Sequence, residues 1–191
     1  MNRAAGSTKT TARGRLAAVL VLAASIVGGQ AAPARVPSKL QLALLTKIFA
    51  QDDSLRDRNK IRIHVVYDPA VPDSAWLKTE VSELARGAAT LAVGGREVEL
   101  EAVPLDALKV RSAPDIYFLC ALKDGSFPAV LQRARAEGIR CFGSEPGDAR
   151  RGAAVSIAAV EGKPRIILNK AAAQAQGARF TDSLIKLAEV L

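Results

Sequence analysis

Residues that could perform acid–base or nucleophilic chemistry are few in this sequence. Its one histidine, His64, lies in the mostly apolar run 61–67, which is typical of a buried strand. Either of the two cysteines, Cys120 and Cys141, would need an activating base, and only His64 could serve as one. No serine-nucleophile elbow, phosphate-binding loop or dinucleotide-binding glycine motif is present. The sequence therefore disfavours an enzyme.

The same side chains are weak candidates for a metal site. Zinc would need His64, Cys120 and Cys141 to converge, and no two of them have the spacing of a metal-binding motif. The two cysteines could form a disulfide in an oxidising compartment or remain two buried thiols, and both interpretations stay open. We expect no metal and no other cofactor.

Carboxylate pairs occur, but without a partner that would shift a pKa. Asp52 and Asp53 follow the first predicted helix and are interpreted as part of the loop that leaves it. Glu97, Glu99 and Glu101 alternate with apolar residues and are interpreted as the wet face of a strand. Neither group is expected to be catalytic.

The first 34 residues have the pattern of a secretory signal peptide. Basic residues precede the apolar run 16–27, which is too short for a membrane-spanning helix and is followed by small residues and proline. We expect cleavage after Ala31 or Ala34, with an uncleaved anchor as the alternative. In both cases residues 35–191 fold outside the cytoplasm, so we expect a periplasmic protein with a single mature domain.

The charge distribution argues against nucleic acid as a partner. The net charge is +8, and four basic residues of the leader account for half of it, which leaves about +4 for the remainder. Basic residues are scattered, and the aromatic residues that would stack on bases make up only 4% of the chain. We expect no nucleic-acid binding.

Strand and helix patterns alternate along the mature chain. Apolar or alternating runs predict strands over 61–67, 97–102, 115–120 and 139–142, and a hairpin over 153–168 with its turn at 161–164. Amphipathic patterns predict helices over 39–50, 73–90, 126–138, 169–177 and 181–191. This order predicts a three-layer α/β/α sandwich with a mainly parallel sheet and an antiparallel C-terminal hairpin.

In such a sheet, ligands bind outside the carboxyl ends of the strands. The predicted strand ends place a small set of polar or compact residues there. We expect a ligand rim made of Tyr67, Asp68, Cys120, Gly143, Ser144 and Glu145.

The helix predicted over 39–50 has more leucine than one buried face requires. We expect it to be buried on two sides or to present an apolar face to a partner. The residues of that partner face are Leu42, Leu45 and Phe49. Aspartate at Leu42 or Phe49 is then expected to abolish partner binding rather than folding.

The last 40 or so residues have a distinctive order of features. Ile167 and Leu168 lead to Asn169, an alanine-rich helix ends at Gly177, and Phe180-Thr181 precede a leucine-rich helix. This order resembles the C-terminal region of the YfiR/HmsC family of periplasmic proteins, and the resemblance extends over about residues 39–191. Its residues have structural roles as helix caps, a left-handed helix exit and packing leucines: Asn169, Gly177, Thr181, Leu184 and Leu187.

The resemblance implies a regulatory protein. Characterised members of the family bind the periplasmic region of a membrane-bound diguanylate cyclase, which lowers cyclic di-GMP and limits biofilm formation. The implied partner is thus a membrane-bound signalling protein, a diguanylate cyclase or the sensor region of a histidine kinase, and a homodimer is also implied.

This sequence departs from the family in lacking a Trp-Pro pair after the first helix and in having Ala153 where a second glycine is usual. Because of the expected crevice at the strand ends, the alternative is a periplasmic small-ligand-binding module that serves a sensor or a transporter.

Overall fold

The structure is a computed structural model that describes residues 35–88 and 91–191. The predicted signal peptide, residues 1–34, lies outside the described residues. Within the described ranges, no helix combines the length and the apolar character needed to cross a membrane.

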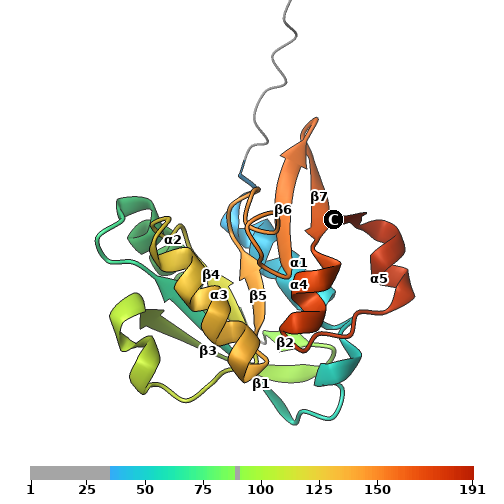
Figure 1. The fold of residues 1–191 in the computed structure, drawn as a ribbon, viewed down its shortest axis with the longest axis horizontal. Coiled ribbons are helices and arrows are strands. Elements are labelled where there is room, and N and C mark those ends of the chain that lie inside the picture. Colours follow the sequence, from blue (N-terminus) through green and yellow to red (C-terminus); the bar gives the residue numbers. More distant parts are fainter. Residues whose placement is uncertain (1–34, 89–90) are drawn as a thin grey trace, which may run out of the picture. The chain divides into compact units, whose positions relative to one another are not determined.

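One eight-stranded sheet forms the centre of the fold (Figure 1). The strand order is β2-β3-β1-β4-β5-β6-β7-β8, and neighbours from β3 to β6 run parallel. The β2–β3 and β6–β7 hairpins are antiparallel, and β8 adds parallel to β7. The strands are Lys60–Tyr67 (β1), Ala92–Val93 (β2), Arg96–Pro104 (β3), Ile116–Leu119 (β4), Arg140–Gly143 (β5), Val155–Val160 (β6), Lys163–Leu168 (β7) and Glu189–Val190 (β8).

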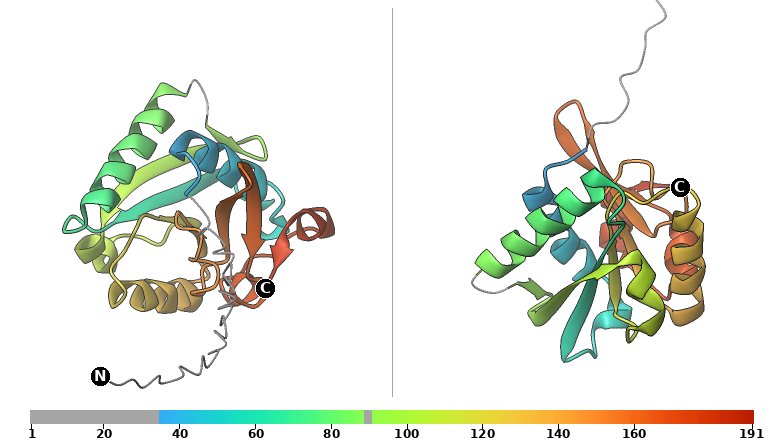
Figure 2. Two further views of the ribbon diagram at one scale, coloured as in Figure 1. Left: turned by 90° about the horizontal axis from the view of Figure 1, so that it is seen from above. Right: turned by 90° about the vertical axis from the view of Figure 1, so that its left-hand side faces the viewer.

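Helices cover both faces of this sheet (Figure 2). The α-helices are Ser38–Phe49 (α1), Pro72–Gly87 (α2), Ser126–Glu137 (α3), Lys170–Ala175 (α4) and Asp182–Leu187 (α5), with short 3-10 segments at Asp53–Leu55 (η1) and Leu105–Val110 (η2). One apolar core packs α1 and α2 against the sheet, and a second packs α3 against the opposite face. This arrangement confirms the predicted α/β sandwich with a mainly parallel sheet and a late antiparallel hairpin.

The alternation of side chains along β1 and β4 divides residues between the two cores. Val65 and Phe118 belong to the core under α1 and α2, whereas Val66 and Tyr117 belong to the core under α3. Successive residues of a strand point to opposite faces, so a continuous apolar run is the pattern of a strand covered on both sides. This is why the short runs in the sequence correctly predicted buried central strands.

The chain's last predicted helix differs from the observed structure. A helix over 181–191 was expected, but α5 ends at Leu187 and the chain then forms β8, which pairs with β7. Leu184 is buried as predicted, whereas Leu187 is 77% exposed and does not pack on the core. The backbone hydrogen bonds gained by adding a strand to β7 replace the last turns of the helix.

The other residues of the C-terminal pattern have the structural roles expected of them. The Asn169 side chain accepts a hydrogen bond from the Ala172 N–H and caps α4, and Thr181 accepts from the Leu184 N–H and caps α5. Gly177 follows α4 with φ of 79°, a left-handed conformation that favours glycine. These positions define how the C-terminal segment folds back onto the sheet.

A buried ion pair joins three segments that are far apart in the sequence. Arg140, at the start of β5, donates from Nε to the Asp52 carboxylate at 3.1 Å, and the two side chains are 8% and 0% exposed. Arg140 also donates to the Gly177 carbonyl at 3.0 Å, and the Arg179 N–H donates to Asp52 at 2.8 Å. The sequence placed Asp52 in the loop after the first helix but did not predict its burial, which arises because the C-terminal segment covers it.

We predict that Asp52→Ala destabilises the protein by about 3–5 kcal/mol, because it leaves the buried Arg140 guanidinium without its counter-charge. Urea unfolding followed by circular dichroism measures this change. The matched control is Asp53→Ala, which removes a carboxylate that is 45% exposed and paired with Arg56, and should cost no more than about 1 kcal/mol. Equal losses in the two variants would contradict the importance of the buried pair.

Candidate functional site

The carboxyl ends of the neighbouring strands β1, β4 and β5 lie together, as the sequence predicted. This region at the ends of the strands is called the carboxyl edge of the sheet. The Cys120 N–H donates to the Val66 carbonyl at 2.9 Å, and the Ser144 N–H donates to the Leu119 carbonyl at 3.0 Å. These bonds place the ends of the three strands side by side. This edge is where ligands bind in open parallel sheets.

Only some of the expected rim residues are available there for a ligand. Asp68 is buried and serves its own turn, since its carboxylate accepts from the Ala70 N–H at 2.9 Å. Gly143 is packed so closely that a Cβ would lie 2.1 Å from the Cβ of Asp148. Tyr67 is half-buried, and the Lys78 ammonium lies 5.1 Å from the centre of its ring. Asp68 and Gly143 therefore shape the edge rather than offer contacts.

The segment that precedes α1 covers the same edge. Val36 is 2% exposed, and the Gln41 side-chain amide donates to the carbonyls of Val36 at 2.7 Å and Ser144 at 3.3 Å. Arg35 forms an ion pair with Glu145 above them. The sequence did not predict this cover, because a single arginine and a single glutamine carry no pattern that indicates a tertiary contact.

Two polar atoms beneath this cover have no hydrogen-bond partner among the described residues. They are Gln41 Oε1 and Ser144 Oγ, and each residue is only 1% exposed. Because buried polar groups are usually paired, unpaired ones mark a place where a ligand or water could supply the missing bond. The carboxyl edge is thus the best candidate for a small-ligand site on this chain.

The loop after β5 is held by a buried carboxylate. Asp148 is 1% exposed and accepts from the Glu145 N–H at 3.1 Å, while Arg151 Nη1 lies 3.3 Å from its other oxygen. Burial raises the pKa of Asp148 to about 6 despite these two contacts, which lower it. The sequence pattern did not reveal this residue, since a lone aspartate in a loop usually faces water.

The two cysteines are free thiols that lie on opposite faces of the sheet. Cys141 pairs with Tyr117 in the register of β5 and β4 and belongs to the core under α3. Cys120 lies three residues beyond Tyr117 and belongs to the core under α1 and α2. A disulfide needs Cβ atoms that point toward each other, so the structure has the second of the two alternatives, two buried thiols.

Burial also makes both thiols poor nucleophiles. It raises the pKa of Cys120 to about 12 and the pKa of Cys141 further above its usual range. His64 and Cys120 belong to different faces of the sheet, because His64 shares the face of Val66. Within residues 35–88 and 91–191, no three histidine, cysteine or acidic side chains gather into a possible metal site.

His64 is a buried histidine of β1 whose ring lies near Glu101 of β3 and Tyr117 of β4. It is 5% exposed, its Nε2 lies 3.7 Å from Glu101, and its ring is 6.3 Å from the ring of Tyr117. Burial lowers the pKa of His64, Glu101 opposes this, and the Arg62, Arg111 and Arg133 guanidiniums reinforce it. No partner for Nδ1 exists among the described residues. The lowered pKa favours the neutral form of this buried imidazole.

The expected partner face on the first helix is wrong. Leu42, Leu45 and Phe49 are 6%, 0% and 1% exposed and belong to the core. The helix is buried on two sides, since Phe49 also packs against Phe180 of the C-terminal segment at 5.7 Å between ring centres. Aspartate at Leu42 or Phe49 would therefore unfold the protein instead of removing a binding surface.

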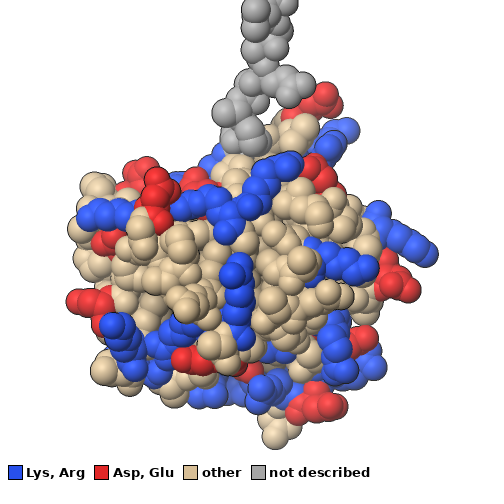
Figure 3. All heavy atoms as spheres, viewed as in Figure 1, with Lys and Arg blue, Asp and Glu red and all other residues tan. Residues whose placement is uncertain are grey.

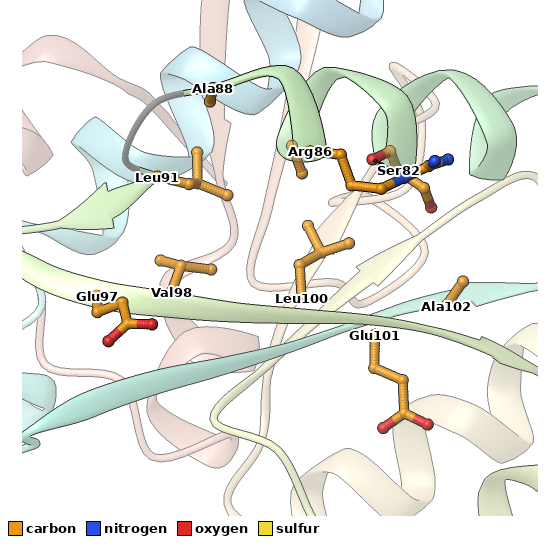
Figure 4. Close-up of a pocket in the computed structure, with 10 residues that line it drawn as sticks. Ser82, Arg86, Ala88, Leu91, Glu97, Val98, Leu100, Glu101 and Ala102 are labelled. Atoms are coloured by element: carbon orange, nitrogen blue, oxygen red, sulfur yellow. Dashed lines mark hydrogen bonds between the residues drawn. The ribbon is translucent and has the colours of Figure 1, made fainter.

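Two grooves flank the C-terminal half of α2 and are larger than the other hollows described among residues 35–88 and 91–191. One, of about 650 Å³, lies between α2 and β3, and the other, of about 550 Å³, lies between α2 and α1. Both are lined in part by Ala88 and Leu91. Figure 4 shows Val98 and Leu100 of β3 pointing toward α2 and Glu101 pointing to the opposite side of the strand. The sequence did not predict these grooves.

Charged residues on the molecular face drawn in Figure 3 are of both signs and interspersed. Among the larger apolar side chains that are exposed, Leu40, Trp76 and Val110 lie far apart along the chain, whereas Leu187, Val190 and Leu191 lie close together near its C-terminal end. The charge distribution is the feature that bears on basic partners. This distribution offers no continuous basic surface on the face shown.

Similarity to known proteins gives a family and a fold. A protein-family model described as YfiR/HmsC-like matches residues 51–189. No curated protein matches the chain. The match begins after α1, so it does not include residues 39–50, for which the sequence also suggested a resemblance.

Two solved structures have a similar fold. An ABC domain from Streptococcus pneumonia in complex with L-Trp has a TM-score of 0.55 at 16% identity, over 81% of this chain and 61% of that one. A conserved domain protein from Vibrio cholerae has a TM-score of 0.53 at 17% identity, over 81% of this chain and 60% of that one. The chain thus spans about three fifths of the length of either structure. At these identities the similarity concerns the fold alone.

We predict that a thiol reagent such as Ellman's reagent does not label the folded protein at pH 8, because the raised pKa values and burial remove the thiolate. In denaturant without a reducing agent, two thiols per chain should react, and one in the Cys120→Ala control. Fewer than two thiols in the denatured wild-type protein would indicate a disulfide and contradict the structure.

The lowered pKa of His64 predicts a pH dependence of stability. At His64 the folded state binds fewer protons than the unfolded chain below pH 6.5, so the contribution of this residue to the free energy of unfolding falls as the pH is lowered through this range. Asp148, whose pKa is raised to about 6, contributes in the opposite direction, so a variant comparison is needed to isolate His64. Denaturant unfolding from pH 8 to pH 5 measures the pH dependence. His64→Phe should have a smaller acid-dependent loss than the wild-type protein, and equal losses would refute this assignment.

Proposed function

The chain belongs to the YfiR/HmsC-like family, and from this premise we propose that it is a periplasmic regulatory protein that binds a membrane-bound signalling protein. The partner is a diguanylate cyclase, and the site of contact is the part of the cyclase that lies outside the inner membrane. Binding lowers cyclic di-GMP and limits biofilm formation.

The observation that carries this proposal is the family match over residues 51–189. This range includes β1 to β7, both partners of the Asp52–Arg140 ion pair and the C-terminal caps Asn169 and Thr181. The similarity therefore covers the parts of the chain that hold the fold together, and is not confined to one motif.

One departure from the family pattern has a structural explanation. Gly152 has φ of 109°, and a Cβ there would lie 2.9 Å from the Arg135 guanidinium. Ala153, at the second position of the pair, is fully buried in the core under α3 without such a conflict. Only the first position requires glycine, so Ala153 is compatible with the family fold.

The chemistry of the described residues supports binding rather than catalysis. The thiols of Cys120 and Cys141 are buried with raised pKa values, and His64 is packed in the core on the face opposite Cys120. The absence of a nucleophile–base pair in the described ranges agrees with a protein that acts through its surface.

A regulator of this kind acts by differential affinity. A cyclase that exchanges between inactive and active states is inhibited when the regulator binds the inactive state more tightly, and it is inhibited only to the extent of that difference. No chemical step on the regulator is needed for this kind of inhibition.

A second candidate function is the binding of a small molecule, and one observation favours it. Gln41 Oε1 and Ser144 Oγ are buried and unpaired at the carboxyl edge of the sheet. A ligand with hydrogen-bond donors could pair with both. Thermal-shift measurements with amino acids, L-Trp among them, would detect such a ligand as a rise in melting temperature that grows with concentration.

We predict that deleting the gene raises cellular cyclic di-GMP and biofilm, and that the exported protein restores both while a variant without residues 1–34 does not. The tagged exported protein should co-purify from gently solubilised membranes with a protein that contains a diguanylate cyclase domain. Unchanged cyclic di-GMP together with no such protein in the eluate would count against the proposal.

A further inference from the structure

The outer edge of β3 is largely unpaired. On its inner side β3 pairs with β1 along the whole register from Glu97 to Pro104. On its outer side β2 pairs only with Arg96 and Glu97. Among residues 35–88 and 91–191, no strand pairs with the outer side of β3 beyond this point. An unpaired edge of this length is a template for another strand.

The direction of the free backbone groups follows from one hydrogen bond. The Val98 N–H points outward, since it donates to the Leu91 carbonyl at 3.0 Å. Backbone groups alternate in direction along a strand, so the N–H and C=O groups of Leu100 and Ala102 also point outward. Pro104 is two residues beyond Ala102, so its nitrogen also points outward. A proline is tolerated there because its missing N–H would not have bonded to β1. Leu100 and Ala102 thus offer two outward N–H donors and their carbonyls.

The groove between α2 and β3 lies along this same edge. Its lining includes residues from both faces of the strand, with Leu100 on the side of α2 and Glu101 on the other side (Figure 4). The α2 wall is lined by Ala85, which is apolar, and by Arg86, and the apolar Leu91 lines the groove from the segment just before β2. A strand laid against β3 would place alternate side chains in the apolar groove and the others beside the glutamates.

The glutamates give this edge a charge preference. Glu97, Glu99 and Glu101 share one face of β3, and their side chains are 71%, 57% and 43% exposed. Lys60 lies 3.6 Å from the first two, and Arg111 lies 3.3 Å from the third. Such exposed ion pairs contribute little to stability, so a basic side chain on a neighbouring strand can join them.

We propose that β3 is extended at this edge by a strand from the partner protein in which apolar residues alternate with lysine or arginine. The identity of the partner rests on the proposed function, whereas the choice of the β3 edge as the binding surface does not. The backbone groups of Leu100 and Ala102 pair with the added strand, its apolar side chains enter the groove beside α2, and its basic side chains face the glutamates.

A second copy of this chain fits the same edge less well than a basic strand does. Two β3 strands related by a two-fold axis perpendicular to the sheet pair antiparallel, with opposite residues on the same face. A pairing centred on Leu100 places Glu99 opposite Glu101 of the other copy, and one centred on Glu101 places that residue opposite itself. Like charges directly opposite each other are destabilising. A pairing centred on Ala102 avoids this contact, because it places Glu101 opposite Val103, but it also places Leu100 opposite Pro104, which has no N–H to donate. The edge therefore favours a different protein with basic residues as its occupant.

The decisive variant is Ala102→Pro, because it removes an outward N–H without removing an inner bond to β1. The matched control is Ala102→Ser, which keeps the N–H at the same position of the groove. In co-purification with the diguanylate cyclase, Ala102→Pro should recover about tenfold less partner, as expected for the loss of a hydrogen bond at the interface, and Ala102→Ser about as much as the wild-type chain. Equal recovery by both, at equal melting temperature, would overturn the proposal and leave the proposed function intact.

A peptide probe tests the surface without any cyclase. The capped peptide Lys-Val-Lys-Val-Lys-Val-Lys should shift the amide NMR signals of Leu100 and Ala102 in the exported chain, and a peptide with glutamate in place of lysine should shift them less. Glu99→Lys should reverse this preference. Shifts confined to the carboxyl edge of the sheet, or no shifts at all, would refute the edge assignment.

The oligomeric state gives the remaining outcome. In sedimentation experiments, the wild-type chain and Ala102→Pro should have the same oligomeric state. A dimer that does disappear in this variant would identify a second copy as the occupant and overturn the proposal of a basic partner.

Discussion

The buried ion pair between Asp52 and Arg140 is the interaction on which the rest of the fold depends. Taking two charges out of water is costly, and the cost is offset only where the remaining donors and acceptors are also satisfied. Here the carboxylate also accepts from the Ser54 and Arg179 N–H groups, and the guanidinium also donates to the Gly138 and Gly177 carbonyls. The pair thereby joins the segment after α1, the start of β5 and the segment after α4.

This connection explains why the C-terminal segment is part of the fold rather than an appendage. The Asp53 N–H donates to the Arg179 carbonyl and the Thr181 N–H donates to the Gln51 carbonyl, so the two segments form an antiparallel bridge around the buried carboxylate. Phe180 is then placed against Phe49 of α1. The leucine-rich face of α1 is buried in the core that it shares with α2, so this face is not available as a docking surface.

A sheet of this type can bind other molecules at the carboxyl ends of its strands or along its outer strands, and these two regions differ in how far they are covered in this protein. Its carboxyl edge is covered by Val36 and by the Gln41 amide, which satisfies the Ser144 carbonyl. At one side of the sheet β8 pairs with β7 only at Ile167 and Leu168, and at the other side β2 pairs with β3 only at Arg96 and Glu97. Both outer strands therefore have main-chain groups without a strand partner among the described residues. The β3 edge is the one that lies along a groove beside α2, and a protein that acts by binding another protein needs such a surface more than an open crevice.

The order of strands and helices could be read from the sequence because it depends on local patterns. The apolar runs that became β1, β4 and β5, the amphipathic α3 with its glycine stop, and the caps at Asn169 and Thr181 each obey rules that act over a few residues. The same locality explains why the family resemblance was visible in the C-terminal third.

The sequence by itself therefore determined the layers, the polarity of the sheet and the lack of a recognisable catalytic motif. Only the tertiary structure decided which side chains became accessible. Asp52 and Leu42 are buried, Leu187 is exposed, the two thiols lie on opposite faces, and the β3 edge is open. The physical reason is that burial depends on which distant segments meet, and a pattern of neighbouring residues records the face of an element but not what covers it.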